Sequence, residues 1–364
     1  MLSAIPESTA RPLLEQANEL QRILFEALVS LPANHQWGKK NSLVAAWVET
    51  LPGWDQLPQL ACARFANPNS PWSLNARAVA TADLQTKANM LRVWQNHRDF
   101  PAAYFANTAL EIVNWSTSAA WTAARDLMEA FYGAVLGSET FPLPQGKTIN
   151  RQVFLDGLDG RLTVCPYCDC GLSRMLVELD HFLPVSVFPF LSIHPDNLVP
   201  VNHYPNVRGR KGSKIPLDNM PASQPRTASQ WFHPRLRTAE GLYDARVTRA
   251  TGQALSVELI ATDPLFAPHV RNLDELVVLA LWWTEEAGRE LRSEYEQVVF
   301  SAKSQNRSHT DILRDQADMF ASLIEPTALR VLKRRKYEYF STNAGELEEM
   351  AREQTEMATG LRLN

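Results

Sequence analysis

The strongest constraint on the fold lies in one central stretch, residues 162–214, where short apolar segments alternate with proline-rich loops. Residues 174–180 are rich in apolar side chains and are predicted to form a strand. A loop punctuated by prolines follows, and residues 197–201 are predicted to form a second strand. Residues 203–212 can form a short helix or a turn. The stretch therefore predicts one compact unit of strand, loop, strand and short helix.

The sequence on both sides of this unit is predicted to be mainly helical. Apolar residues recur there at helical spacing, and prolines or glycines end several of the periodic segments. Helices are expected over 8–31, 42–51, 58–66, 75–96 and within 101–136 before the unit. After it, helices are expected over 272–301, over 308–340 with a break or bend near Pro326, and over 344–358. Asn272 is expected to cap the first of the later helices. Alternating residues over 243–249 and 253–261 predict a β-hairpin.

These patterns predict a mainly α fold with a small α+β insert and three parts. We expect a helical N-terminal domain over 1–140, the insert over 141–215, and a C-terminal region over 216–364 in which helices follow the β-hairpin.

Composition limits the classes of function. The 364 residues carry a formal net charge of −4, so a nucleic-acid contact would require a local basic patch. No apolar run approaches the ~20 residues that a bilayer crossing needs, and no secretory signal is evident. Three of the four cysteines lie close together, a pattern typical of metal binding or free thiols rather than of a disulfide framework. We therefore expect a cytoplasmic protein.

Groups suited to metal-assisted hydrolysis are concentrated in the central unit. Asp180 and His181 are adjacent, Asn197 opens the second predicted strand, and Asn206 follows it. A neutral imidazole can take a proton from water near neutral pH. A carboxylate is a hard oxygen ligand that suits Mg²⁺ or Mn²⁺. Neighbours on a regular strand point to opposite faces, so both side chains reach one point only where the strand ends or distorts.

The order of these residues resembles the HNH nuclease family, whose core is the ββα-metal (His-Me) finger. The resemblance covers roughly residues 164–211, and the runs CPYC, DHFLPVSVFPFLS and PDNLVP, followed by Asn206, carry it. It implies that His181 is the general base and that Asp180 and Asn206 hold one Mg²⁺ or Mn²⁺ ion. His203 is the alternative ligand to Asn206. It also implies that Asn197 ties the loop after the first strand and orients the catalytic histidine.

The cysteines depart from the family pattern. Zinc-bearing relatives have a second Cys-x-x-Cys pair before the last motif position, where this chain has Asn202 and Pro205. A structural Zn²⁺ would then need another set of ligands: Cys165, Cys168, Cys170 and His203. The alternative is that these cysteines are reduced thiols packed in the turn.

The resemblance implies a metal-dependent HNH endonuclease that hydrolyses phosphodiester bonds, with DNA favoured over RNA by family habit. Four basic residues are the expected contacts to backbone phosphates: Arg208, Arg210, Lys211 and Lys214. By analogy, such a nuclease serves bacterial anti-phage defence or a mobile element, beside an ATPase. The chain has no Walker-type loop, so an ATPase would be a separate partner protein. The competing hypothesis is a catalytically inactive finger that binds nucleic acid or protein.

Overall fold

The computed structural model describes residues 4–33, 35, 37, 43–137, 139–158, 162–172, 177–203, 211–220, 224–251, 253–323 and 329–359. Over these residues the protein is mainly helical, with small two-stranded antiparallel sheets. This confirms the prediction of a mainly α protein with little strand. In the same residues, no helix combines the length and the hydrophobicity that a membrane crossing requires.

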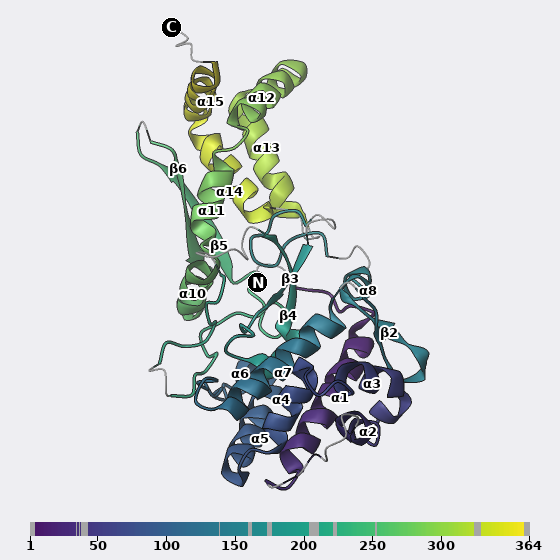
Figure 1. Ribbon diagram of the computed structural model, residues 1–364. Coiled ribbons are helices and arrows are strands. Elements are labelled where there is room, and N and C mark those ends of the chain that lie inside the picture. Colours follow the sequence, from purple (N-terminus) through teal and green to yellow (C-terminus); the bar gives the residue numbers. More distant parts are fainter. Residues whose placement is uncertain are drawn as a thin grey trace.

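The N-terminal half is a block of packed helices at the lower end of the molecule in Figure 1. Its helices are α1 (Arg11–Ser30), α2 (Leu43–Val48), α3 (Pro58–Phe65), α4 (Pro71–Ala80), α5 (Leu84–Arg98), α6 (Phe100–Phe105) and α7 (Ala119–Val135). The single helix predicted over 75–96 is wrong, because the chain forms α4 and α5 there. The Asp83 side chain accepts a hydrogen bond from the Thr86 amide at 2.8 Å and begins a new helix.

A short connection leads from this block to the central unit. It contains β1 (Phe141–Pro142), β2 (Thr148–Ile149) and α8 (Arg151–Asp156). The central unit itself is the antiparallel pair of β3 (Val177–His181) and β4 (Leu198–Asn202). The end of β3 and both ends of β4 lie one residue from the predicted bounds. The first residues of the strand predicted over 174–180 lie outside the described residues. The 3₁₀ turn η5 (Pro195–Asn197) leads into β4. Most of the predicted short helix over 203–212 lies outside the described residues.

The β3–β4 pair lies between two hydrophobic cores. Leu179 and Leu198 belong to the core of the N-terminal helices, whereas Val199 and Val201 belong to a second core that extends into the C-terminal half. Side chains on a strand alternate between its two faces, so consecutive residues face different cores. Burial on both faces explains why β4 is apolar up to its last residue, whereas β3 carries three polar side chains that find specific partners.

The C-terminal half begins with the predicted β-hairpin, β5 (Tyr243–Arg249) and β6 (Leu255–Ala261). Its helices are α10 (Ala267–Val277), α11 (Leu279–Ala287), α12 (Leu291–Gln305), α13 (His309–Ser322), α14 (Arg330–Thr342) and α15 (Ala344–Thr359). Figure 1 shows that α12, α13 and α15 project away from the N-terminal block.

The continuous helix predicted over 272–301 is wrong, because three helices replace it. The chain breaks at Val278 and Glu290, whose φ angles are 55° and 58°. After the first break, the Asp274 carboxylate accepts a hydrogen bond from the Ala280 amide at 2.7 Å, which satisfies the start of α11. Asn272 does not cap a helix; it lies inside α10 and donates to the Gln230 carbonyl.

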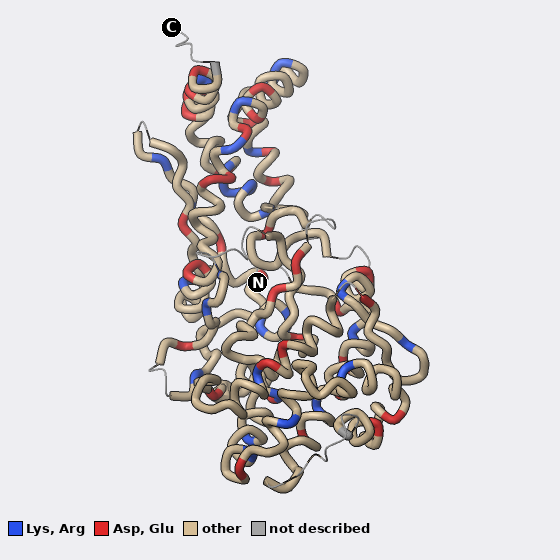
Figure 2. Tube along the Cα trace, viewed as in Figure 1, with Lys and Arg blue, Asp and Glu red and all other residues tan. Residues whose placement is uncertain are grey.

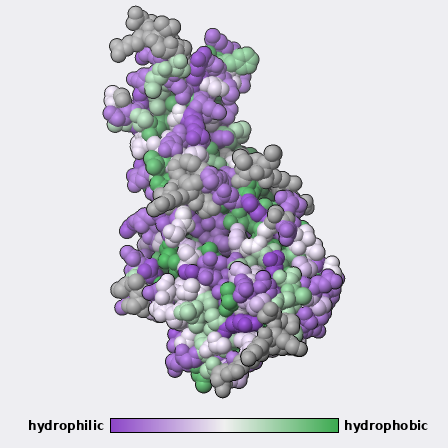
Figure 3. Space-filling model, in the orientation of Figure 1, coloured by the Kyte–Doolittle hydropathy of each residue, from purple (hydrophilic) through white to green (hydrophobic). Residues whose placement is uncertain are grey.

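The surface carries charge of both signs. Figure 2 shows Lys and Arg interspersed with Asp and Glu along the trace, and the face drawn in Figure 3 mixes hydrophilic and hydrophobic residues. A nucleic-acid contact would therefore depend on a local group of basic residues, as the net charge of −4 already indicates.

Candidate active site

His181 is held at the end of β3 by a loop carbonyl. Its Nε2 lies 2.8 Å from the Ser192 oxygen, and its ring packs at 4.5 Å from the ring of Tyr132 on α7. A carbonyl oxygen can only accept, so this contact assigns the proton to Nε2 and leaves the Nδ1 lone pair as the basic position. Burial lowers the pKa of His181, which favours the neutral imidazole at pH 7.

Ser192, whose carbonyl contacts His181, is itself held through its side chain by two helices of the N-terminal block. Gln21 on α1 donates to Ser192 Oγ at 3.1 Å, and that hydroxyl donates to the Met128 carbonyl on α7 at 2.8 Å. Ser192 is fully buried. The position of His181 therefore depends on helices more than fifty residues away in sequence, and no local motif indicates this support.

Asn197 closes the loop between the two strands. Its Oδ1 accepts from the Leu183 amide at 2.7 Å, and its Nδ2 donates to the carbonyls of Leu183 at 3.0 Å and Leu191 at 3.2 Å. The side chain is fully buried. These three bonds are the kind of contact that the expected bracing role requires, because the loop between Leu183 and Leu191 leads to the carbonyl that His181 contacts.

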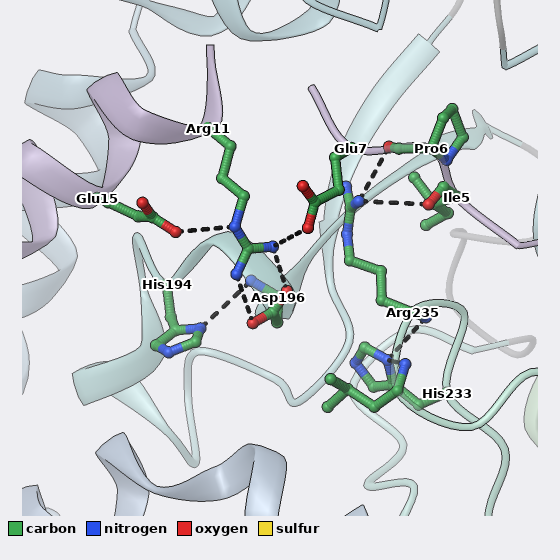
Figure 4. A network of polar contacts seen from close by, with 10 residues as sticks. Ile5, Pro6, Glu7, Arg11, Glu15, His194, Asp196, His233 and Arg235 are labelled. Carbon is green, nitrogen blue, oxygen red and sulfur yellow. Dashed lines mark hydrogen bonds and ion pairs between the residues drawn. The ribbon is translucent and has the colours of Figure 1, made fainter. Parts of the chain in front are cut away.

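A network of polar side chains joins the residue before Asn197 to the N-terminal segment, as Figure 4 shows. The two Asp196 oxygens accept from Arg11 at 2.6 and 3.0 Å, and Arg11 also bonds to Glu15. Burial raises the pKa of Asp196, but the hydrogen bonds and charge of Arg11 outweigh burial and hold that pKa below its usual value. The first turn of α1 thus anchors η5, whose last residue is Asn197.

Two histidines, the partly buried His194 and the buried His233, extend the same network. The Asp196 amide donates to His194 Nδ1 at 3.3 Å, and the Arg235 amide donates to His233 Nδ1 at 3.1 Å. Burial lowers the pKa of His194 to about 4 and that of His233 to about 3, so both rings are neutral at pH 7. Arg235 in turn donates to backbone carbonyls of the N-terminal segment, including that of Pro6 at 3.0 Å.

Asp180 lies on the opposite face of the β3–β4 pair. It is paired across the strands with Val199, whereas His181 is paired with Leu198. Its Oδ2 accepts from the Tyr167 hydroxyl at 2.7 Å and pairs with the Lys211 ammonium at 2.6 Å. The two side chains expected to meet at one point therefore contact different parts of the protein. The regular strand pairing that continues to His181 is the physical reason.

Lys211 differs from the expectation of an exposed phosphate contact. Only 1% of the residue is exposed, and its Nζ also donates to the His181 carbonyl at 2.5 Å. Burial lowers the pKa of Lys211, while attraction to Asp180 opposes that shift. Lys214 is exposed, and its ammonium bonds to the carbonyls of Glu275 and Leu276 at the end of α10. Three further predicted residues, Asn206, Arg208 and Arg210, lie outside the described residues.

No protein-family model, curated protein or solved structure compared with the chain matches it.

In the described part of the chain, the four predicted zinc ligands do not form one metal-binding group, although Cys168 contacts both Cys165 and Cys170. His203 is exposed, and its Nδ1 pairs with Glu178 at 2.7 Å. Cys165 and Cys168 are buried, and Asn202 contacts both: its amide lies 3.4 Å from Cys165 Sγ and its side-chain nitrogen 3.8 Å from Cys168 Sγ. Asn202 therefore stands beside the first cysteine pair, at one of the two positions where the family pattern expected from the sequence would place a second cysteine pair.

Cys170 points to another partner. Its Sγ accepts from the Trp282 indole at 2.9 Å, while the neighbouring Trp283 donates to the Cys168 carbonyl at 3.2 Å. Burial raises the pKa of Cys165. The contact with Cys165 lowers the pKa of Cys168, but the contact with Cys170, together with burial, outweighs it and raises that pKa to about 12, so both groups favour the thiol over the thiolate. These contacts favour packed thiols in the turn, the alternative that the sequence left open.

For a catalytic divalent ion, the described residues supply one suitable oxygen ligand. Asp180 provides a hard carboxylate that already faces a cation, the Lys211 ammonium. Among the described residues, no three His, Cys, Asp or Glu side chains meet to hold a metal. The second predicted ligand, Asn206, lies outside them. The carboxylate thus fits a Mg²⁺ or Mn²⁺ ion that has few protein ligands and completes its shell with phosphate oxygens and water.

Proposed function

We propose that the chain is a metal-dependent HNH endonuclease that hydrolyses phosphodiester bonds of nucleic acid, with DNA favoured. The observation that carries the proposal is the antiparallel β3–β4 pair, with His181 ending the first strand and Asn197 closing the loop before the second. A partly buried imidazole in the neutral form, with one nitrogen held by a carbonyl, is the arrangement a general base needs.

In this proposal His181 Nδ1 takes the proton from the attacking water, while the Nε2–H bond to Ser192 keeps the ring oriented. Asp180 and Asn206 would hold Mg²⁺ or Mn²⁺. When bound, that ion would supply positive charge to the phosphate and the leaving oxygen. The side chains of Asp180 and His181 point to opposite faces of the strand pair. The substrate phosphate would therefore lie at the end of β3, beside both side chains.

Binding of the polyanion would rest on Arg208, Arg210 and Lys214, since Lys211 is buried. The ammonium of Lys214 bonds to two backbone carbonyls of α10 and would exchange those bonds for a phosphate oxygen. We further propose, by analogy with nucleases of this form, a role in bacterial defence or in a mobile element with a separate ATPase partner.

A plasmid-nicking assay with Mg²⁺ or Mn²⁺ tests the enzyme. His181→Ala should reduce the cleavage rate by about 10²- to 10⁴-fold, because it removes the base. His309→Ala, in α13 of the projecting helices, is the matched control and should cleave like the wild type. Equal cleavage by the His181 variant and the wild type would exclude His181 from the mechanism.

The alternative function is an inactive finger that binds nucleic acid or protein. One observation favours it: the Asp180 carboxylate already pairs with Lys211 and accepts a hydrogen bond from Tyr167. In that case purified wild type would bind a DNA duplex in a gel-shift assay but would not cleave it with any divalent ion. Metal-dependent cleavage that is lost in Asp180→Asn would exclude this alternative.

A further inference from the structure

The buried pair of Asp180 and Lys211 lies in the proposed active site and has a consequence for metal binding. We propose that the Lys211 ammonium is a built-in counter-charge that keeps divalent metal weakly bound until nucleic acid is present. The inference rests on the proposed function, because it takes Asp180 to be the metal ligand. It makes Lys211 a positioning residue that acts through Asp180, in place of the expected surface contact.

The Lys211 ammonium lies close enough to Asp180 to repel a metal ion bound to that carboxylate. Lys211 Nζ lies 2.6 Å from Asp180 Oδ2 and 2.5 Å from the His181 carbonyl oxygen, so acceptors from both proposed site residues hold it. The Tyr167 hydroxyl donates to the same Oδ2 at 2.7 Å. An ion bound to the other carboxylate oxygen, or one that displaces Lys211 from Oδ2, would lie within a few ångströms of the ammonium.

The local charges then oppose binding of the ion alone. The Asp180 carboxylate and the Lys211 ammonium sum to zero, and His181 is neutral. Glu178, two residues earlier on the same face of β3, pairs with His203 at the exposed edge. A divalent cation therefore meets a carboxylate whose attraction the ammonium largely cancels, at a buried position where water screens little.

Nucleic acid would remove this opposition. Its phosphates supply the negative charge that the pair lacks, so phosphate and metal stabilise each other beside the ammonium. Binding of either one should then increase the affinity for the other by the same factor. The expected consequence is a nuclease that is poorly loaded with metal when no substrate is bound.

The test measures Mn²⁺ affinity by isothermal titration calorimetry without nucleic acid. Lys211→Gln removes the charge but keeps a hydrogen-bond donor for Asp180, and it should bind Mn²⁺ at least about tenfold more tightly than the wild type. Lys211→Arg keeps the charge and should stay near the wild-type affinity. The matched control is Lys336→Gln, which removes a buried lysine paired with Glu294 at 2.6 Å in the C-terminal helices and should change nothing.

The outcomes separate a failure of the inference from a failure of the proposed function. Tighter binding in Lys211→Gln that disappears when Asp180→Asn is added supports the inference. Unchanged, weaker or undetectable Mn²⁺ binding in Lys211→Gln overturns it, while plasmid cleavage by the wild type and its loss in His181→Ala would still support the nuclease.

A second measurement leaves Lys211 unchanged and so does not depend on whether its variants fold. In His181→Ala protein, which should not cleave, Mn²⁺ should raise the affinity for a DNA duplex about tenfold in a fluorescence-anisotropy titration. Mg²⁺ and Mn²⁺ without effect on DNA affinity would overturn the inference.

Discussion

Replacing Asn197 by Ala should release the loop between β3 and β4. The change removes three hydrogen bonds, two with Leu183 and one with Leu191, all in a fully buried environment. Each such bond contributes about 1 kcal/mol net, and a buried group left without its partner costs more. The loop should therefore lose about 3 kcal/mol of stability against opening, which corresponds to a change of roughly a hundredfold in its opening equilibrium.

Hydrogen–deuterium exchange with mass spectrometry measures this effect directly. In Asn197→Ala, a peptide that contains Leu183 should exchange roughly a hundredfold faster than in the wild type under conditions where exchange reports the opening equilibrium. The exchange rates of peptides from α12 to α15 should be unchanged, because the three hydrogen bonds of Asn197 involve none of these helices. Asn89→Ala, on the exposed face of α5, is the matched control and should leave the loop unchanged.

The same variant should also lose nuclease activity, because the loop carries the Ser192 carbonyl that orients His181. Exchange at Leu183 that rises less than about tenfold, or equally in both variants, would show that Asn197 does not close the loop in the way its contacts suggest.

Two further predictions concern the network around Asp196. Arg11→Ala should lower the free energy of unfolding by about 2 kcal/mol in urea denaturation, because it leaves the mostly buried Asp196 carboxylate without its cation. Arg22→Ala is the control on the same helix. It breaks ion pairs that are partly exposed and should lower the free energy of unfolding by less than about 1 kcal/mol. Equal losses would contradict this reasoning. His194 and His233 have folded-state pKa values of about 4 and 3, below the unfolded value, so the unfolded chain takes up protons first as the pH falls. The stability from both rings is present above about pH 6.5 and is lost as the pH falls toward 4 for His194 and toward 3 for His233, by about 1.4 kcal/mol for each histidine at pH 5.5. A urea midpoint that is equal at pH 7.5 and pH 5.5 would refute it.

Local patterns predicted the strands well. The hairpin of β5 and β6 follows the alternation of apolar and polar residues almost to the residue, because each strand has one buried and one exposed face over most of its length. The β3–β4 pair was found from its apolar composition and the prolines between the strands. Both are cases in which the local signal and the tertiary environment agree.

Helix lengths were predicted less well where tertiary contacts interrupt a continuous pattern. Gly288 stands just before the second break, but nothing in the sequence near Val278 signals the first, and a β-branched residue at positive φ is locally unfavourable. The break accompanies the packing of α11 against β6, with Trp283 fully buried. Packing of a large side chain can outweigh such a local cost, and no periodicity reports it.

The sequence by itself determined which groups are available for chemistry and their order: the carboxylate and imidazole of Asp180 and His181, and the amide of Asn197 that leads into the second strand. Only the tertiary structure decided what those groups contact. It turned Asp180 toward Tyr167 and Lys211, and His181 toward Ser192. The physical reason is that a strand between two cores sends consecutive side chains to opposite faces, so the partners of one cannot be the partners of the other.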